Sequence, residues 1–247
     1  MRRMSRAVAP LLAVVLLAAC TAPGPARPRP HWAAEPARGA ASAPLGHTVT
    51  GPRDGLDAAT FTLVSGVTTL IVRVDDLDDD LYQVRTPDGS RIAPVVNADG
   101  GDLRLLVEGT GQAGPATVGV TLHRAVRWHL RFGGGAEDEH VDLSGGDVSA
   151  VEFLAGSSRI SLTLPEPHGT VPVRMTGGAG DFVVHLTGDA PARVRLGGGA
   201  GSVLVDGAAR SGIPGGTVIE GAGWSSARDR YDVDAAAGVS SLVVDRA

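Results

Sequence analysis

The sequence GGAGDFVVH at residues 177–185 returns 21 residues later as GGAGSVLVD at residues 198–206. Each copy joins a glycine-rich turn to a segment in which apolar and polar residues alternate. Alternation with a period of two is typical of a half-buried β-strand. A glycine-rich turn before such a strand can bind phosphate, bind calcium or reverse the backbone between two strands, and the choice decides what kind of protein this is.

The residues around the two turns argue against the first two options. A phosphate-binding P-loop needs a lysine and a following helix, but the chain has no lysine and a strand pattern follows each turn. The G-x-G-x-x-G dinucleotide pattern fails because Val183 and Leu204 occupy the third glycine position. The calcium-binding nonapeptide places an aspartate two residues after its last glycine, whereas Asp181 follows Gly180 directly. We therefore expect these glycines to supply positive φ angles in tight turns.

The two copies belong to a longer repeat of about 20 residues. Equivalent segments begin at Leu130, Val151, Val173, Val194 and Val233. The last step is almost two units long, and we expect residues 217–223 to hold the missing unit. Further strand patterns precede the repeat at residues 62–74, 95–107 and 117–122.

This pattern predicts an all-β fold, a single-domain β-solenoid or stacked β-hairpin repeat over residues 46–247, with a β-sandwich as the alternative. Such units bury their apolar faces by stacking on their neighbours. The alternation predicts that Arg193 and Arg195 point outward. We expect six side chains to fill equivalent inward positions and residues 240–245 to finish the stack; the six are Phe182, Val184, Val203, Val205, Leu242 and Val244.

The repeated strand–Gly/Ala–strand units, strongest over residues 128–245, resemble the bacterial β-strand-repeat proteins known as putative adhesins, including the toast-rack-like group. The resemblance covers roughly residues 60–245. It implies an envelope location and a binding or scaffolding role, and it supplies no catalytic residues. The segment Gly135–His140 departs from the repeat, because polar residues replace the expected apolar start of a strand.

The first residues resemble a bacterial lipoprotein signal peptide. A basic start and a short apolar segment fill residues 1–19, and Leu17-Ala18-Ala19-Cys20 matches a lipobox. The resemblance implies that the leader is cleaved before Cys20 and that this cysteine, the only one in the chain, is lipidated. Two acyl chains anchor a protein firmly to a membrane. Residues 20–45 are rich in Pro and Ala, which predicts a disordered tether.

Candidate chemical groups are few. The acidic run at residues 75–80 could bind a divalent cation but is better interpreted as a solvated loop, and the cluster at residues 137–140 is similar. We expect surface imidazoles at His123 and His129, which could approach on neighbouring strands. Five residues could share an outer face in a polysaccharide-active enzyme: Arg174, Asp181, His185, Arg193 and Arg195.

The function predicted from the sequence is that of a bacterial lipoprotein, anchored to the extracytoplasmic face of the cell membrane, with a non-catalytic, adhesin-like binding or scaffold domain. The alternatives are an envelope sensor or accessory subunit and the polysaccharide-active β-helix enzyme. We predict no cofactor and no metal. The net charge of −5 and the lack of a basic patch argue against nucleic-acid binding. An envelope protein or a glycan is the expected partner, beside the membrane.

Overall fold

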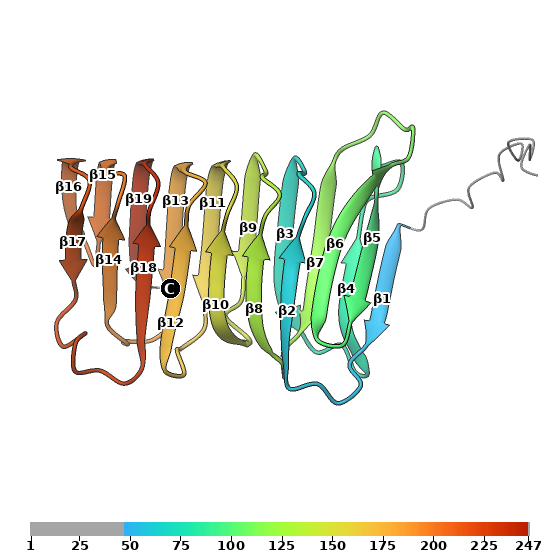
Figure 1. Ribbon diagram of the computed structural model, residues 1–247, viewed down its shortest axis with the longest axis horizontal. Helices are drawn as coiled ribbons and strands as arrows, with labels where there is room; N and C mark the ends of the chain where they lie inside the picture. The colour runs from blue at the N-terminus through green and yellow to red at the C-terminus, as the bar shows by residue number, and fades with distance from the viewer. Residues whose placement is uncertain (1–46, 247) are drawn as a thin grey trace, which may run out of the picture. The chain divides into compact units, whose positions relative to one another are not determined.

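The computed structural model describes residues 47–246, which form an all-β body of two sheets (Figure 1). Sheet A has ten strands in the spatial order β1 (Thr48–Pro52), β4 (Asp80–Arg85), β7 (Thr117–His123), β3 (Thr69–Asp75), β9 (Asp138–Asp142), β11 (Ser157–Leu164), β13 (Ala179–Leu186), β19 (Val239–Arg246), β15 (Ala200–Val205) and β16 (Ala208–Ile213). Sheet B has nine strands in the order β17 (Thr217–Glu220), β14 (Ala192–Leu196), β18 (Arg230–Ala235), β12 (Thr170–Met175), β10 (Asp147–Phe153), β8 (Arg127–Phe132), β2 (Ala58–Leu63), β6 (Asp102–Gly109) and β5 (Ile92–Asp99).

The repeating unit is a rung, in which a strand of sheet B, a short turn and a strand of sheet A follow one another along the chain. The rungs are β2–β3, β6–β7, β8–β9, β10–β11, β12–β13, β14–β15 and β18–β19. Neighbouring rungs pair in parallel in both sheets. Antiparallel pairs occur at the ends of the stack, where β5, β4 and β1 lie on one side and β16 and β17 on the other. The predicted stacked-repeat fold is confirmed.

The repeat predicted from the sequence is in register residue for residue. Leu130 lies beside Val151, Val151 beside Val173, and Val173 beside Val233. Val194 also lies beside Val233. Period-two alternation fixes this register, because a slip of one residue would move every apolar side chain to the solvent face.

The spatial order of the rungs differs from their order in the sequence. The last rung, β18–β19, lies between β12–β13 and β14–β15 and pairs with both. The expectation that residues 240–245 finish the stack is therefore wrong. Residues 217–223 do not hold a missing rung either, because β17 runs antiparallel to β14 at the edge of sheet B. The first rung, β2–β3, is likewise inside the stack and not at its end, because it lies between β6–β7 and β8–β9.

One continuous core fills the space between the sheets. The six side chains predicted to point inward are all buried there. The four phenylalanines of the chain form a column across the rungs, with ring centroids 6.5, 5.0 and 5.8 Å apart in the order Phe61, Phe132, Phe153, Phe182. Aromatic pairs at these separations add about 0.5–1.5 kcal/mol each beyond area burial.

The glycines of the GGAG turns have two separate roles. Gly178 and Gly199 have φ angles of 78° and 79°, which confirms the predicted left-handed turn. The preceding glycines allow close approach between stacked turns. A Cβ on Gly177 would lie 2.0 Å from the carbonyl carbon of Ala155, and one on Gly198 would lie 2.3 Å from the nitrogen of Gly238. Neighbouring turns therefore touch through bare backbone.

Replacing a close-approach glycine should disrupt the stack. We expect Gly177→Ala to lower the free energy of unfolding by about 1–3 kcal/mol or more, because the new methyl group must displace the neighbouring backbone. Gly109→Ala is the matched control, since a Cβ there meets nothing within 4 Å, and it should change stability by less than about 0.5 kcal/mol. Urea denaturation measures both, and equal stability of the two variants would contradict the close packing of the turns.

Candidate functional site

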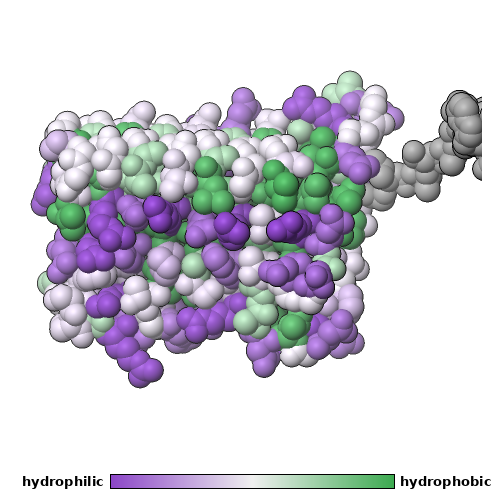
Figure 2. Space-filling view, viewed as in Figure 1, coloured by the Kyte–Doolittle hydropathy of each residue, from purple (hydrophilic) through white to green (hydrophobic). Residues whose placement is uncertain are grey.

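Charged side chains alternate in sign along the outer face of sheet B. The strand register places Glu152 between Arg131 and Arg174, and Asp234 between Arg174 and Arg195. Arg131 Nε donates to Glu152 Oε2 at 2.8 Å. On the face drawn in Figure 2, hydrophilic side chains form bands that run across the stack. The five charged residues that the register places side by side are here called the charge ladder; they are Arg131, Glu152, Arg174, Asp234 and Arg195.

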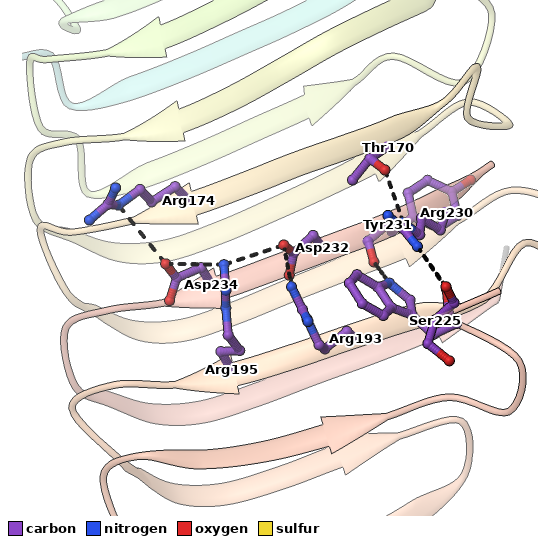
Figure 3. A network of polar contacts seen from close by, with 10 residues as sticks. Thr170, Arg174, Arg193, Arg195, Ser225, Arg230, Tyr231, Asp232 and Asp234 are labelled. Atoms are coloured by element: carbon purple, nitrogen blue, oxygen red, sulfur yellow. Dashed lines mark hydrogen bonds and ion pairs between the residues drawn. The ribbon is translucent and has the colours of Figure 1, made fainter. Parts of the chain in front are cut away.

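A second pair of charges, Arg193 and Asp232, lies beside the ladder where the last rung enters the stack (Figure 3). Asp232 accepts two hydrogen bonds from Arg193, from Nε at 3.2 Å and Nη2 at 2.9 Å, and a third from Arg195 at 3.3 Å. Its side chain is 14% exposed. Hydrogen bonding to Asp232 raises the pKa of the Arg193 guanidinium further above its usual value. Asp234 lies 3.7 Å from Arg195 and 4.0 Å from Arg174.

The sign of these charges favours the observed order of rungs. If β14 paired directly with β12 in the same register, Arg195 would lie beside Arg174. Like charges on directly neighbouring strands are destabilising. With β18 between them, both arginines face an aspartate instead, so the side-chain charges help to select this arrangement.

A tryptophan covers the end of this network. Trp224, in the loop before β18, donates from Nε1 to the carbonyl of Tyr231 at 2.7 Å. The guanidinium groups of Arg193 and Arg230 lie 3.6 and 4.4 Å from its ring centroid. Such cation–π contacts contribute about 0.5–2 kcal/mol. The loop, the ladder and the inserted rung thus stabilise one another.

Tyr231 fastens the same rung from inside. Its ring is fully buried, and its hydroxyl lies 2.8 Å from the carbonyl of Pro165 and 2.9 Å from that of Thr187. Burial raises the pKa of this phenol to about 12. The inserted strand therefore holds connecting segments from both neighbouring rungs.

A hollow of about 330 Å³ lies on the outer face of sheet B, toward the other end of the stack. Its floor consists of small residues, Ala58, Ala59 and Gly101, and longer side chains surround it, from Thr60, Asp102, Arg127, His129 and Ser149. A β-bulge in β10 between Val148 and Ala150 places Ser149 at its edge. Bulges often occur beside binding sites. This hollow was not predicted from the sequence, in which the small Ala58 and Thr60 on one strand face are its only signal.

The acidic run at residues 75–80 spans the turn between β3 and β4, with its first residue at the end of β3 and its last at the start of β4. Carboxylates of Asp75 and Asp76 accept hydrogen bonds from backbone amides of the turn, at 2.8 and 3.2 Å. Asp78 has a φ of 51°. Within residues 47–246, no three His, Cys, Asp or Glu side chains are grouped as metal ligands.

The cluster at residues 137–140 does not form one site, because strand alternation separates its side chains. His140 and Glu137 are exposed, and Asp138 forms an ion pair with Arg159 on the neighbouring strand. Glu139 points inward and is 1% exposed. It occupies the position that Leu70 and Ile160 have in the adjacent strands.

Glu139 is a carboxyl group in an apolar core. The Ser157 hydroxyl donates to Oε1, while Oε2 has no hydrogen-bond partner among the described residues. Burial raises the pKa of this carboxyl to about 7, although the Ser157 hydrogen bond lowers it in part.

His123 and His129 lie in different sheets, and so do the five residues that were grouped for the polysaccharide-active enzyme. His123 is buried in sheet A, not on the surface as expected, and its Nδ1 accepts from the amide of Ala125 at 3.0 Å. His129 lies in sheet B, so the two histidines are not on neighbouring strands. Asp181 and His185 belong to sheet A, whereas the three arginines belong to sheet B. The five residues do not share a face.

The predicted leader at residues 1–19, the lipidated Cys20 and the tether at residues 20–45 lie outside the described residues. Residues 47–246 contain no helix with the length and hydrophobicity needed to cross a membrane.

Comparisons with known proteins agree with the fold. No protein-family model and no curated protein matches the sequence. A solved structure of a putative cell adhesion protein from Clostridium sporogenes ATCC 15579 is similar, with a TM-score of 0.59 and 15% identity, over 81% of this chain and 98% of that one. A putative adhesin from Bacteroides fragilis NCTC 9343 aligns over 82% and 98%, with 9% identity and a TM-score of 0.26, too low to support an argument. At 15% identity, the first likeness shows a shared all-β fold and no more.

The first prediction for this site concerns Asp232. We expect Asp232→Ala to lower the free energy of unfolding by about 1.5–3 kcal/mol, because charged hydrogen bonds are lost and two guanidinium groups lose a partner. Asp181→Ala, on an exposed position of sheet A, should change stability by less than about 0.5 kcal/mol. Urea titrations compare the two, and a silent Asp232→Ala would mean that the network does not stabilise the inserted rung.

The second prediction concerns pH. Below the ordinary carboxyl pKa of 4.5, Glu139 is protonated in both the folded and unfolded states. Between pH 4.5 and about 7 the folded state keeps a proton that the unfolded state has lost, so stability falls as pH rises through this window. The expected total from this group is about 3 kcal/mol.

Glu139→Gln should remove this contribution, whereas Glu137→Gln, an exposed neighbour, should retain it. The measurement is the free energy of unfolding in urea at about pH 5 and about pH 8 for the parent and both variants. The assignment fails if the parent and Glu139→Gln lose stability equally between the two pH values.

Proposed function

We propose that the protein is a lipid-anchored lipoprotein of the bacterial cell membrane whose β body is a non-catalytic, adhesin-like binding or scaffold domain on the extracytoplasmic face. The observation that carries the proposal is the outer face of sheet B, where charged side chains pair with their neighbours along the stack. Paired charges give an extended, regular surface suited to contact with another molecule. The fold likeness to a protein described as a putative cell adhesion protein is consistent with such a role.

The anchor rests on the N-terminal sequence. Leu17-Ala18-Ala19-Cys20 supplies the small residues and the cysteine of a lipobox, and two acyl chains suffice for stable membrane attachment. Residues 20–45 would then separate the β body from the lipid surface. Such a tether lets the domain reach partners beyond the headgroups, which suits a binding domain.

Cys20→Ser tests the anchor. In a bacterial host, we expect the full-length parent to be in the membrane fraction and to incorporate a palmitate label, and Cys20→Ser to lose the label and leave the membrane. Ser42→Ala, beyond the lipobox, is a control that should behave as the parent. A Cys20→Ser protein that stays in the membrane fraction as before would contradict lipid anchoring.

Attachment is tested separately on whole cells. Cells that display the full-length protein should adhere to a glycan- or protein-coated surface better than cells that carry an empty vector. Equal adhesion of the two cell types on every surface would argue against the adhesin-like role, whatever the outcome of the anchoring test.

A further inference from the structure

Gly119 is a glycine that the backbone of this fold does not require. It lies inside β7, which pairs with β4 on one side and with β3 on the other. A Cβ on Gly180 or Gly201 would lie 2.6 or 2.7 Å from a neighbouring carbonyl oxygen. A Cβ on Gly119 would meet nothing closer than the Arg85 carbonyl oxygen at 3.9 Å, and its φ angle is not positive. Glycine weakens the interior of a strand and often marks a place where a ligand approaches the backbone closely.

The missing side chain leaves a recess of about 200 Å³ in the outer face of sheet A. Arg85 and Ile71 lie directly beside Gly119 on the two neighbouring strands. Arg73 and Thr121 line the recess two residues further along β3 and β7. Ile71 is 43% exposed, so the lining offers an apolar contact as well as charge. We call this feature the Gly119 recess.

Arg73 reaches from β3 over β7. Its Nε donates to the Thr121 hydroxyl at 3.2 Å, and Thr121 is only 7% exposed. This hydrogen bond holds the guanidinium over the neighbouring strand, and its two Nη groups form no hydrogen bond within residues 47–246. Arg85 is on the opposite side of β7. The two guanidinium groups therefore flank the recess.

The charge at the recess is of one sign. The ion pairs among residues 47–246 join other arginines to carboxylates, and neither Arg73 nor Arg85 forms one. Asp142 lies beside Arg73 in the strand register, but its carboxylate accepts hydrogen bonds from the backbone amide and the hydroxyl of Ser144. Two unpaired guanidinium groups on a protein with a net charge of −5 favour an anionic ligand.

The rest of the lining indicates the kind of anion. A guanidinium group matches a planar carboxylate through two parallel hydrogen bonds. Because β7 is paired on both sides, the recess lacks the array of free backbone amides that commonly surrounds a phosphate. Ile71 and the strand backbone instead provide a surface for a short apolar group. A carboxylate attached to a few carbon atoms therefore fits the charge, the surface and the volume.

We propose that the Gly119 recess binds the carboxylate of a ligand with a short apolar group, with Arg73 and Arg85 donating to the carboxylate oxygens and Ile71 contacting the carbon atoms. The C-terminal residue of a peptide and a free short-chain acid share this chemistry. The inference goes beyond the proposed function, because it concerns sheet A and depends on neither the lipid anchor nor adhesion.

Saturation-transfer difference NMR on the full-length protein in deuterated detergent tests the proposal. The probes are butyrate, N-acetyl-alanyl-alanine and the C-terminal amide of that dipeptide. We expect signal from at least one of the two acids and none from the amide. Signal from butyrate alone would identify a free acid as the ligand, and signal from the dipeptide acid alone would identify a peptide C-terminus.

Three variants locate the site. Arg85→Gln should weaken binding of the acid by about tenfold, since hydrogen bonds to charged groups are the strong ones. Gly119→Val should abolish binding, because the new side chain fills the recess while both arginines remain. It should be at least as stable in urea as the parent, because valine suits a strand. Arg104→Gln is the matched control, an exposed arginine of sheet B, and should bind as the parent does.

Each of five other outcomes overturns the proposal. Silence from both acids would remove the ligand class, and equal binding of the amide would mean that the arginines are not used. Binding that Arg85→Gln or Gly119→Val leaves unchanged would place the site elsewhere. Displacement of the acid by an equal concentration of inorganic phosphate would indicate a phosphate site. A less stable Gly119→Val would show that the fold itself requires the glycine. Anchoring and adhesion are measured separately, so the proposed function stands or falls on its own tests.

Discussion

Parallel strands stacked in register lie about 4.8 Å apart, and this spacing governs the structure. Each position in one rung lies directly beside the same position in the next. A turn can stack only if its neighbours leave room, which explains why Gly177 and Gly198 cannot carry a side chain. An inward position must be apolar in every rung, because it is surrounded by its own equivalents. A charged side chain on the outer face is favourable only if the same position in the neighbouring rung carries the opposite charge or no charge.

The pairing of opposite charges on the outer face connects the side chains to the order of the rungs. Asp232 and Asp234 reach the arginines of two rungs because β18 lies between β12 and β14. Tyr231 fastens the same strand to connecting segments on both sides. Glu139 is the exception inside the core, a carboxyl group where the adjacent strands have leucine and isoleucine. Its Ser157 partner compensates for one oxygen and not for the other.

The sequence predicted the local part of this fold well. Alternation within each strand is a local signal, so the inward side chains and the alignment of Leu130 with Val151 and Val173 follow from it. The order of the rungs does not, because it depends on which repeat pairs with which, and all repeats share one pattern. The charges on β12, β14 and β18 hold that information, but reading it requires the register between strands. The same limit hid the hollow, whose lining comes from strands far apart in the chain. The expectation that Asp181 and Arg174 share a face was wrong for a similar reason, because the turn between β12 and β13 moves the chain from sheet B to sheet A.

The position of β18–β19 has a consequence for biosynthesis. Domains that emerge from the ribosome generally fold from the N-terminus onward, and a simple solenoid can add its rungs in the order of translation. Here β18–β19, which is translated after both of its neighbouring rungs, occupies an interior place between them. Until it is made, β12–β13 and β14–β15 lack the rung that separates them in the folded body. The two parts of the stack therefore reach their final arrangement only after β18–β19 has been translated, so the body cannot form by adding rungs in the order of the sequence.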